Sequence, residues 1–225
     1  MTGFCSSRIE RGISREAVFI IGAGHFGSRA ATLICRSTDV PVFVIDIDKE
    51  SLSGLGSLPV NIVIHDGIDF LVENFHLLDP AHTIVPALPL HLASEWLERH
   101  FRGLCSIEEI PVPEEISPLL PYTWPGSGGS LLVSYADFVC PDDCPEPEYC
   151  TTTGEKRYKP LYGLLGDLVL PEFRVHIITS RQLAPGLGGV PGGRFDGSGG
   201  EIGRGKAGKV AHWYCVQMPR CSVGP

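Results

Sequence analysis

Three glycines and one acid near the start of this sequence have the types and spacing that chemistry requires. Gly22, Gly24 and Gly27 form a G-x-G-x-x-G pattern. They follow the apolar run 18–21, and Asp46 ends the next apolar run. Gly22 permits a tight turn, Gly24 keeps the backbone open to a pyrophosphate, and Gly27 lets the following helix approach a sheet. The pattern predicts a dinucleotide-binding turn, although such glycines also suit a tight turn without a ligand.

Other side chains around this turn complete the predicted cofactor site. Asp46 can accept hydrogen bonds from both ribose hydroxyls and would repel a 2′-phosphate, so NAD is favoured over NADP. His25 and Phe26 lie within the glycine pattern and are further candidates for cofactor contact. Asp66 follows a third apolar run, at the end of the strand where open parallel sheets bind ligands. It is predicted to touch the adenine end, to cap the next helix, or to do both.

His91 is the candidate for proton transfer, because histidine changes its charge near neutral pH. It follows the apolar run 83–87, whose loop is expected near the reactive ring of a dinucleotide. The alternative is a helix cap or an ordinary surface histidine. The neighbouring His76, His82 and His100 are predicted to be surface residues.

Three cysteines form a separate cluster later in the chain. Cys140, Cys144 and Cys150 have the spacing C-x3-C-x5-C on a proline-rich loop. Thiolates bind zinc and iron strongly, so zinc or an iron–sulfur cluster is the first hypothesis for this loop. A fourth ligand is missing locally, and the spacing matches neither a zinc ribbon nor a bacterial ferredoxin. A redox disulfide and unliganded structural thiols are the alternatives.

The elements that must position these residues alternate between strand and helix. This order predicts an α/β fold, a Rossmann-type mostly parallel sheet with a cysteine-containing C-terminal extension. Strands are expected at 18–21, 42–45, 60–64 and 83–87, and helices at 25–36, 49–58, 68–77 and 92–101. The extension is expected to contain strands at 130–135 and 173–179 and a helix at 158–168.

Changes in composition divide the chain into five segments. Residues 1–16 are predicted to be a flexible lead-in, and residues 17–106 a dinucleotide-binding domain. The proline- and glycine-rich segment 107–129 is predicted to be a linker, because its prolines forbid a regular helix. Residues 130–185 form the cysteine-cluster segment, and the glycine-rich tail 186–225 is predicted to be disordered.

A single-nucleotide frameshift near residues 188–190 is a second hypothesis for this tail. Codons compatible with the printed residues, read one base later, can spell a helical leucine pattern followed by Cys-x-Cys-His. That motif would supply the ligands that the cysteine loop lacks. The printed tail offers only His212, Cys215 and Cys221, at spacing that does not suit a metal site.

Charge and hydropathy exclude several classes of partner. The net charge of -8 argues against nucleic acid and anionic membranes, which are bound through clustered Lys and Arg. The sequence has no apolar run of membrane-spanning length and no secretion signal. We therefore expect the protein to be cytoplasmic and not inserted in a membrane. The thiols of its cysteines should then be reduced.

Residues 17–100 resemble the Trk-A N-terminal type of NAD-binding domain, found in the regulatory proteins of bacterial potassium uptake. The segments IIGAGHFG and VFVIDIDKE carry this resemblance. Over a longer range the chain looks like a small group of uncharacterised bacterial proteins that share CPDDCPEP, CTTTGE and SRQLAPG. Those proteins continue into a Cys-x-Cys-His-Gly segment, from which this chain departs after Gly186. The second ligand-binding domain usual in Trk-A-type proteins has no match here.

Two functions fit these observations. The first is an NAD-binding protein with a cysteine-ligated metal or iron–sulfur centre, a small redox protein or dehydrogenase in which His91 donates a proton. The second is a non-catalytic module that senses NAD and NADH, in which any metal is structural. A homodimer is one expectation for either, because domains of this type often pair. The sequence indicates no substrate.

Overall fold

The computed structural model describes residues 16–101, 111–126, 129–170, 174–192 and 210–213. The chain divides into two compact units. The first unit contains residues 1–102 and 188–203, and the second contains residues 103–187 and 204–225. The predicted lead-in lies almost wholly outside the described residues.

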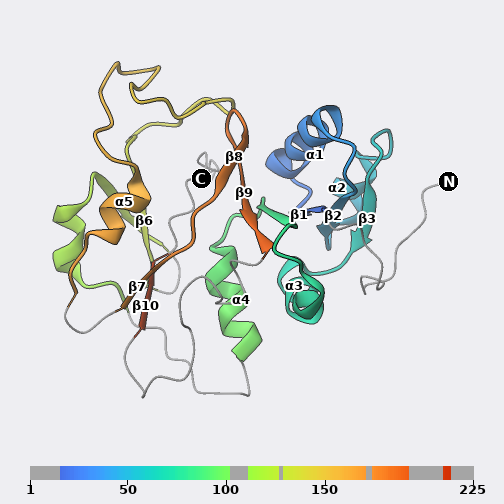
Figure 1. Ribbon diagram of the computed structural model, residues 1–225, viewed down its shortest axis with the longest axis horizontal. Helices are drawn as coiled ribbons and strands as arrows, with labels where there is room; N and C mark the ends of the chain where they lie inside the picture. Colours follow the sequence, from blue (N-terminus) through green and yellow to red (C-terminus); the bar gives the residue numbers. More distant parts are fainter. Residues whose placement is uncertain (1–15, 102–110, 127–128, 171–173, 193–209, 214–225) are drawn as a thin grey trace. The chain divides into compact units, whose positions relative to one another are not determined.

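The first unit is built around a mostly parallel sheet with the strand order β3-β2-β1-β4-β9-β8 (Figure 1). Strand β1 pairs in parallel with β2 and β4, β2 pairs in parallel with β3, and β9 pairs antiparallel with β4. In chain order the elements of the first unit are β1 (Val18–Ile21), α1 (His25–Ser37), β2 (Val42–Asp46), α2 (Lys49–Ser53), β3 (Asn61–Ile64), α3 (Gly67–Asn74), the 3-10 turn η1 (Phe75–Leu77), β4 (Thr83–Pro86), α4 (Leu92–Phe101) and β9 (Leu187–Pro191). The last strand in the sheet order, β8 (Arg181–Ala184), belongs to the residues of the second unit. The division between the units falls at the start of β9. The predicted α/β class with a mostly parallel sheet is confirmed.

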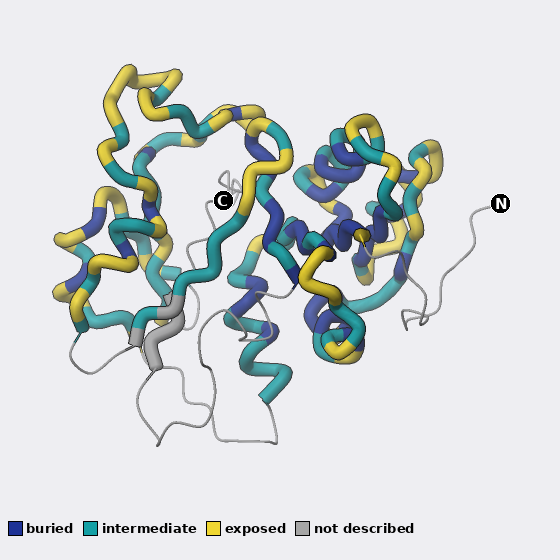
Figure 2. Tube along the Cα trace, viewed as in Figure 1, coloured by how far each residue is buried: buried dark blue, intermediate teal, exposed yellow. Residues whose placement is uncertain are grey.

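The core of this unit is the central part of the sheet. Phe19, Ile20 and Ile21 of β1 are fully buried. Phe19 stacks on Phe43 of β2, with ring centroids 5.1 Å apart. Central parallel strands are covered on both faces, which is why they are continuous apolar runs rather than alternating ones. Figure 2 shows this burial along the strands of the unit.

The topology of the sheet reverses at β1. Strands β2 and β3 extend the sheet on one side of β1, and β4 extends it on the other. Helices α1 and α3 accordingly lie on opposite faces (Figure 1). Such a reversal opens a crevice at the carboxyl ends of the two strands beside it. The glycine turn therefore follows β1 at the place where ligands of open α/β sheets bind.

The helices differ from the predicted ranges mainly at their ends. Helix α4 has the predicted bounds, whereas α2 ends at Ser53, because Gly54 and Gly56 follow. The helix predicted over 68–77 is α3 followed by η1. Among the described residues, no helix is both long enough and apolar enough to cross a membrane.

The second unit has a smaller core of its own. Ile116, Leu120, Leu161 and Leu165 are buried together. Its further elements are the 3-10 helix η2 (Glu114–Leu119), β5 (Tyr122–Pro125), β6 (Leu131–Ser134), α5 (Leu161–Gly166), β7 (Arg174–Ile177) and β10 (Val210–Trp213). Strands β5 and β6 form an antiparallel hairpin, and β7 pairs in parallel with β10.

The segment predicted as a linker, 107–129, differs from that prediction where it is described. It forms η2 and β5, and it contributes Ile116 and Leu120 to the core of the second unit. Its prolines exclude a regular α-helix, but they are compatible with a short 3-10 helix and with a two-stranded ribbon.

The tail predicted to be disordered, 186–225, also begins with regular structure. Residues 187–191 form β9, in which Leu187 and Val190 are buried. Val190 pairs with Ile84 of β4. The two glycines between Leu187 and Val190 conceal the apolar alternation, so the strand was not predicted. Residues 193–209 and 214–225 lie outside the described part of the chain, and the shifted reading frame remains a hypothesis.

Candidate functional site

The glycine turn after β1 has a shape that only glycine permits at two of its positions. Gly22 has φ +107°, and a Cβ there would lie 2.6 Å from the carbonyl oxygen of Ala87. A Cβ at Gly27 would lie 1.9 Å from the carbonyl oxygen of Gly22. Both distances are shorter than any real contact of a Cβ atom. These two glycines bring the loop after β4 and the start of α1 close to β1.

Gly24 is different, because packing does not require glycine there. It is exposed, and a Cβ at this position would meet no atom of the described structure within 4 Å. Gly24 is also the N-cap of α1, which has no side-chain cap and no acid in its first turn. By contrast, Asp48 caps α2 and Asp66 caps α3 through hydrogen bonds. The positive end of α1 thus faces open space at Gly24.

Asp46 fastens this turn to the end of β2. The backbone N–H of Ala23 donates to Oδ2 of Asp46 at 2.6 Å, and the N–H of Asp48 donates to Oδ1 at 2.8 Å. The next residue, Ile47, exposes 70% of its surface. The structure therefore brings Asp46 to the glycine turn, as the sequence predicted, and places an exposed apolar side chain next to it.

His25 and Phe26 are the first two residues of α1. His25 is exposed and Phe26 is half-buried. Their rings meet edge to face, with centroids 5.2 Å apart. Both predicted cofactor contacts therefore lie at the start of the helix that follows the glycine turn.

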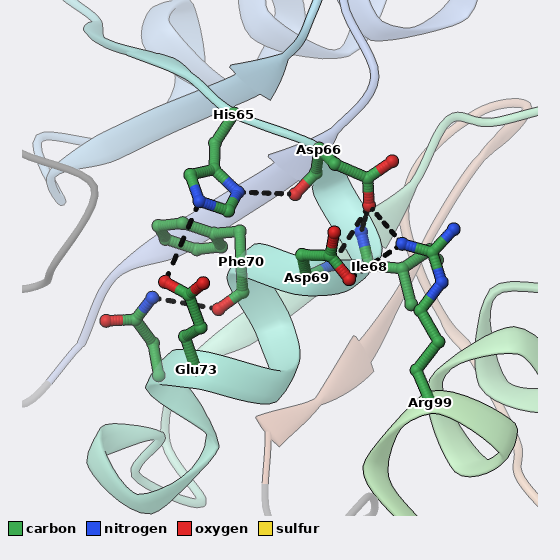
Figure 3. A network of polar contacts seen from close by, with 8 residues as sticks. His65, Asp66, Ile68, Asp69, Phe70, Glu73 and Arg99 are labelled. Carbon is green, nitrogen blue, oxygen red and sulfur yellow. Dashed lines mark hydrogen bonds and ion pairs between the residues drawn. The ribbon is translucent and has the colours of Figure 1, made fainter. Parts of the chain in front are cut away.

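Asp66 caps the N-terminus of α3, which confirms the prediction that it caps the helix after β3. Its Oδ1 accepts hydrogen bonds from the backbone N–H groups of Ile68 and Asp69, both at 2.9 Å (Figure 3). Nη1 of Arg99, in α4, lies 2.8 Å from the same oxygen and 2.8 Å from Oδ1 of Asp69. Burial acts to raise the pKa of Asp66, but the Asp69 N–H and the Arg99 charge outweigh it and lower the pKa.

Arg99 is a residue of this site that sequence reasoning missed. Its pKa is raised, first by its hydrogen bond to Asp69. In the sequence it is merely a cation in the last turn of a helix, where cations are common. No local pattern links it to Asp66, which lies in another helix–strand unit.

His65 also lies in this polar network. Its Nδ1 is 2.9 Å from the carbonyl oxygen of Asp66, and its Nε2 is 3.6 Å from Oε2 of Glu73 (Figure 3). The first contact requires a proton on Nδ1, because a carbonyl oxygen can only accept a hydrogen bond. His65 therefore holds the backbone of the residue that caps α3.

The histidines after β4 differ from one another in environment. His91 directly precedes α4, and burial lowers its pKa. A neutral imidazole is thus favoured near pH 7. The prediction that His82 is a surface residue is wrong, because only 4% of His82 is exposed. Its Nδ1 accepts the N–H of Asp79 at 3.0 Å, and its ring packs edge-on against Phe19.

The three cysteines of the predicted metal centre do not form a metal-binding group among the described residues. Among the described residues, no group of three or more His, Cys, Asp or Glu side chains is arranged to hold a metal ion. Cys144 is buried, whereas Cys140 and Cys150 are half-buried. Cys150 lies in a short hairpin, in which Tyr149 pairs with Lys156. The expectation that a stiff loop would make these thiolates converge is therefore not met by the described residues.

The loop Cys140–Cys144 instead packs against the turn between β8 and β9. The N–H of Gly186 donates to the carbonyl oxygen of Cys144 at 2.9 Å. Gly186 has φ +67°, and a Cβ there would lie 1.7 Å from the carbonyl oxygen of Asp142. Two motifs that are far apart in the sequence, CPDDC and APG, are therefore in direct backbone contact.

Among the four described cysteines, Cys150 is the one that we expect to react fastest with alkylating agents. A hydrogen bond with the side chain of Thr153, helped by the N–H groups of Thr153 and Thr152 and by the Arg157 charge, lowers its pKa to about 7. Since the thiolate is the reactive form, the rate of alkylation of Cys150 by iodoacetamide should rise through a midpoint near pH 7. Cys35 should react more slowly, because burial raises its pKa.

Mass spectrometry of the alkylated peptides over a range of pH measures this midpoint. Thr153→Ala should move the midpoint upwards, because it removes the largest stabilising contact. Thr151→Ala, an exposed neighbour that is not among these causes, is the matched control. An unchanged midpoint in Thr153→Ala would contradict the account.

The fold and the glycine turn define an α/β protein whose mostly parallel sheet is compatible with a Rossmann-like arrangement. The model of the family AF_1314_C, described as "Uncharacterized protein, C-terminal domain", matches residues 93–210. This match spans more than half of the chain, and the chain belongs to that family. It begins within α4 and includes the cysteine loop, whereas the glycine turn precedes it.

One relative matches over most of its length. It is a protein of Archaeoglobus fulgidus, also described as uncharacterized, and it is 29% identical over 194 residues. The alignment covers 77% of this chain and 83% of the relative. No solved structure matches the chain significantly.

Proposed function

We propose that the first unit binds NAD, with the pyrophosphate over the glycine turn. The observation that carries this proposal is the start of α1. Its N-terminus has no side-chain cap in the described structure, and it faces open space at Gly24. The backbone N–H groups and the helix dipole at such an end attract phosphate. A turn that needed glycine only for packing would not need it at Gly24.

The residues beside the turn fit the remaining parts of NAD. Asp46 would accept hydrogen bonds from the ribose hydroxyls of the adenosine half. Ile47 would cover one face of the base, because it is apolar and largely exposed beside Asp46. Asp66, at the end of the neighbouring strand β3, would accept a hydrogen bond from the base. NAD would supply hydride chemistry when bound, but binding alone is what this geometry supports.

Of the two functional hypotheses, we favour a nucleotide-sensing module over a dehydrogenase. The observation behind this choice is His91, whose pKa is lowered by burial. A histidine that is neutral near pH 7 is poorly suited to the proton-donor role that the redox hypothesis assigns to it. We therefore propose that the chain reports on NAD by binding it.

The preference for NAD over NADP tests this proposal through Asp46. Asp46→Asn keeps the shape of the side chain and one oxygen for the Ala23 N–H, but it removes the charge that repels a 2′-phosphate. Isothermal titration should show that the preference of the parent protein for NAD falls by about tenfold in this variant.

Asp48→Asn is the matched control for Asp46→Asn. It removes a charge two residues away, and asparagine still caps α2. The preference for NAD should not change in this control. If both variants changed the preference equally, the effect would come from net charge rather than from a ribose contact, and the proposed site would be wrong.

A further inference from the structure

The hydrogen bonds that the Asp66 carboxylate accepts from the described residues all go to one of its two oxygens. The Ile68 N–H, the Asp69 N–H and Nη1 of Arg99 all contact Oδ1. Within the described part of the chain, no hydrogen bond or ion pair involves Oδ2. In Figure 3 the second oxygen points away from Arg99 and from α3. The side chain of Asp66 is 38% exposed, so solvent or a ligand can reach it.

Arg99 fixes the direction in which this carboxylate points. Its Nη1 lies between Oδ1 of Asp66 and Oδ1 of Asp69, at 2.8 Å from each (Figure 3). The helix that carries Arg99 is anchored by Leu92, Ala93 and Trp96, which are buried. A cation on an anchored helix, held by two carboxylates, restricts the rotation of Asp66 more than the two N–H groups alone.

The outward oxygen of Asp66 lies at the same sheet edge as the ribose-binding candidate Asp46. Strands β2 and β3 are parallel, and Asp46 is in register with Ile64. The N–H of His65 donates to the carbonyl oxygen of Asp46 at 3.1 Å. Neighbouring strands are only about 4.8 Å apart. A nucleoside whose ribose is held by Asp46 can therefore place its base beside Asp66.

We propose that Arg99 is a positioning residue for base recognition: it holds Oδ1 of Asp66, so that Oδ2 accepts a hydrogen bond from the exocyclic amino group of adenine. The inference rests on the proposed NAD site. An ionised carboxylate can only accept hydrogen bonds, so it discriminates against a purine that lacks that amino group. The lowered pKa of Asp66 keeps this carboxylate ionised at neutral pH.

Two dinucleotides that differ only at this group provide the test. They are NAD and its purine analogue, in which a hydrogen atom replaces the 6-amino group of the base. The parent protein should bind NAD at least about tenfold more tightly, because the analogue leaves a charged acceptor unpaired. In Arg99→Gln the ratio of the two dissociation constants should fall close to one, mainly through weaker binding of NAD.

The controls separate positioning from a merely structural role. Arg99→Lys keeps the charge and should restore part of the ratio. Arg36→Gln removes a cation from the last turn of α1, where it is exposed, and should leave the ratio unchanged. If Arg99→Gln is poorly folded, Asp69→Asn, which removes one of the two partners of Arg99, should give an intermediate ratio.

The outcomes distinguish this inference from the proposed function. If loss of Arg99 weakened both dinucleotides equally, its role would be structural and the inference would be overturned. If the parent protein bound both equally, base recognition by Asp66 would be wrong while NAD binding stood. If the folded parent protein bound neither, the proposed function itself would fail, and this inference with it.

Discussion

Replacing Gly27 with alanine is expected to unfold the first unit. The new Cβ would lie 1.9 Å from the carbonyl oxygen of Gly22 and 2.8 Å from its carbonyl carbon. Both are backbone atoms, and the surroundings of Gly22 are themselves crowded, since a Cβ added at Gly22 would lie 2.6 Å from the carbonyl oxygen of Ala87. Overpacking of this kind costs about 3 kcal/mol or more, a large part of the 5–15 kcal/mol (roughly) that stabilises a typical domain.

Gly24→Ala is the control for this prediction, since a methyl group there meets nothing within 4 Å. Urea unfolding followed by circular dichroism should show Gly24→Ala within about 0.5 kcal/mol of the parent protein. Its affinity for NAD should nevertheless fall at least about tenfold, because the methyl group stands where the pyrophosphate approaches. Equal stability of Gly27→Ala and Gly24→Ala would show that the turn does not have the described geometry.

Replacing Gly186 with alanine is expected to have the largest effect in the second unit. The Cβ would lie 1.7 Å from the carbonyl oxygen of Asp142, so the turn and the Cys140–Cys144 loop could not keep their contact. The hydrogen bond from the Gly186 N–H to Cys144 would be lost as well. With the cost of a left-handed conformation added, we expect a loss of about 3 kcal/mol or more.

Gly154 provides a matched comparison for Gly186. It has a similar φ, +74°, but a Cβ there would meet nothing within 4 Å. Gly154→Ala should therefore cost only about 1 kcal/mol of backbone strain. Limited proteolysis should cut the Cys140–Cys144 loop much faster in Gly186→Ala than in Gly154→Ala. Similar rates in the two variants would argue against the contact between the CPDDC and APG motifs.

The elements of the first unit could be predicted because their signals are local. Strand β1 is an uninterrupted apolar run. The spacing of Gly22, Gly24 and Gly27 is typical of one kind of tight turn between a strand and a helix. Asp66 caps α3, as expected for an acid directly before a helix. Each of these features depends on residues that are close together in the sequence.

The remaining features depend on contacts between residues that are distant in the sequence, and no local sequence pattern predicts them. Arg99 meets Asp66 across 33 positions. Strand β9 is recognisable only through its partner β4, because glycines interrupt its apolar pattern. His82 is buried because Asp79 and Phe19 surround it in space. The metal hypothesis for the cysteine loop rests on thiolate chemistry, prolines and spacing, none of which determines where the thiols point.

Titration of the parent protein with NAD tests the central claim most directly. The claim is that the open, uncapped end of α1 at Gly24 receives the pyrophosphate of NAD. Isothermal titration of folded protein should show saturable, equimolar binding of NAD and weaker binding of NADP, and Gly24→Ala should reduce the NAD signal. The claim would be contradicted if folded protein showed no saturable binding of either dinucleotide. It would also be contradicted if Gly24→Ala bound NAD as tightly as the parent protein.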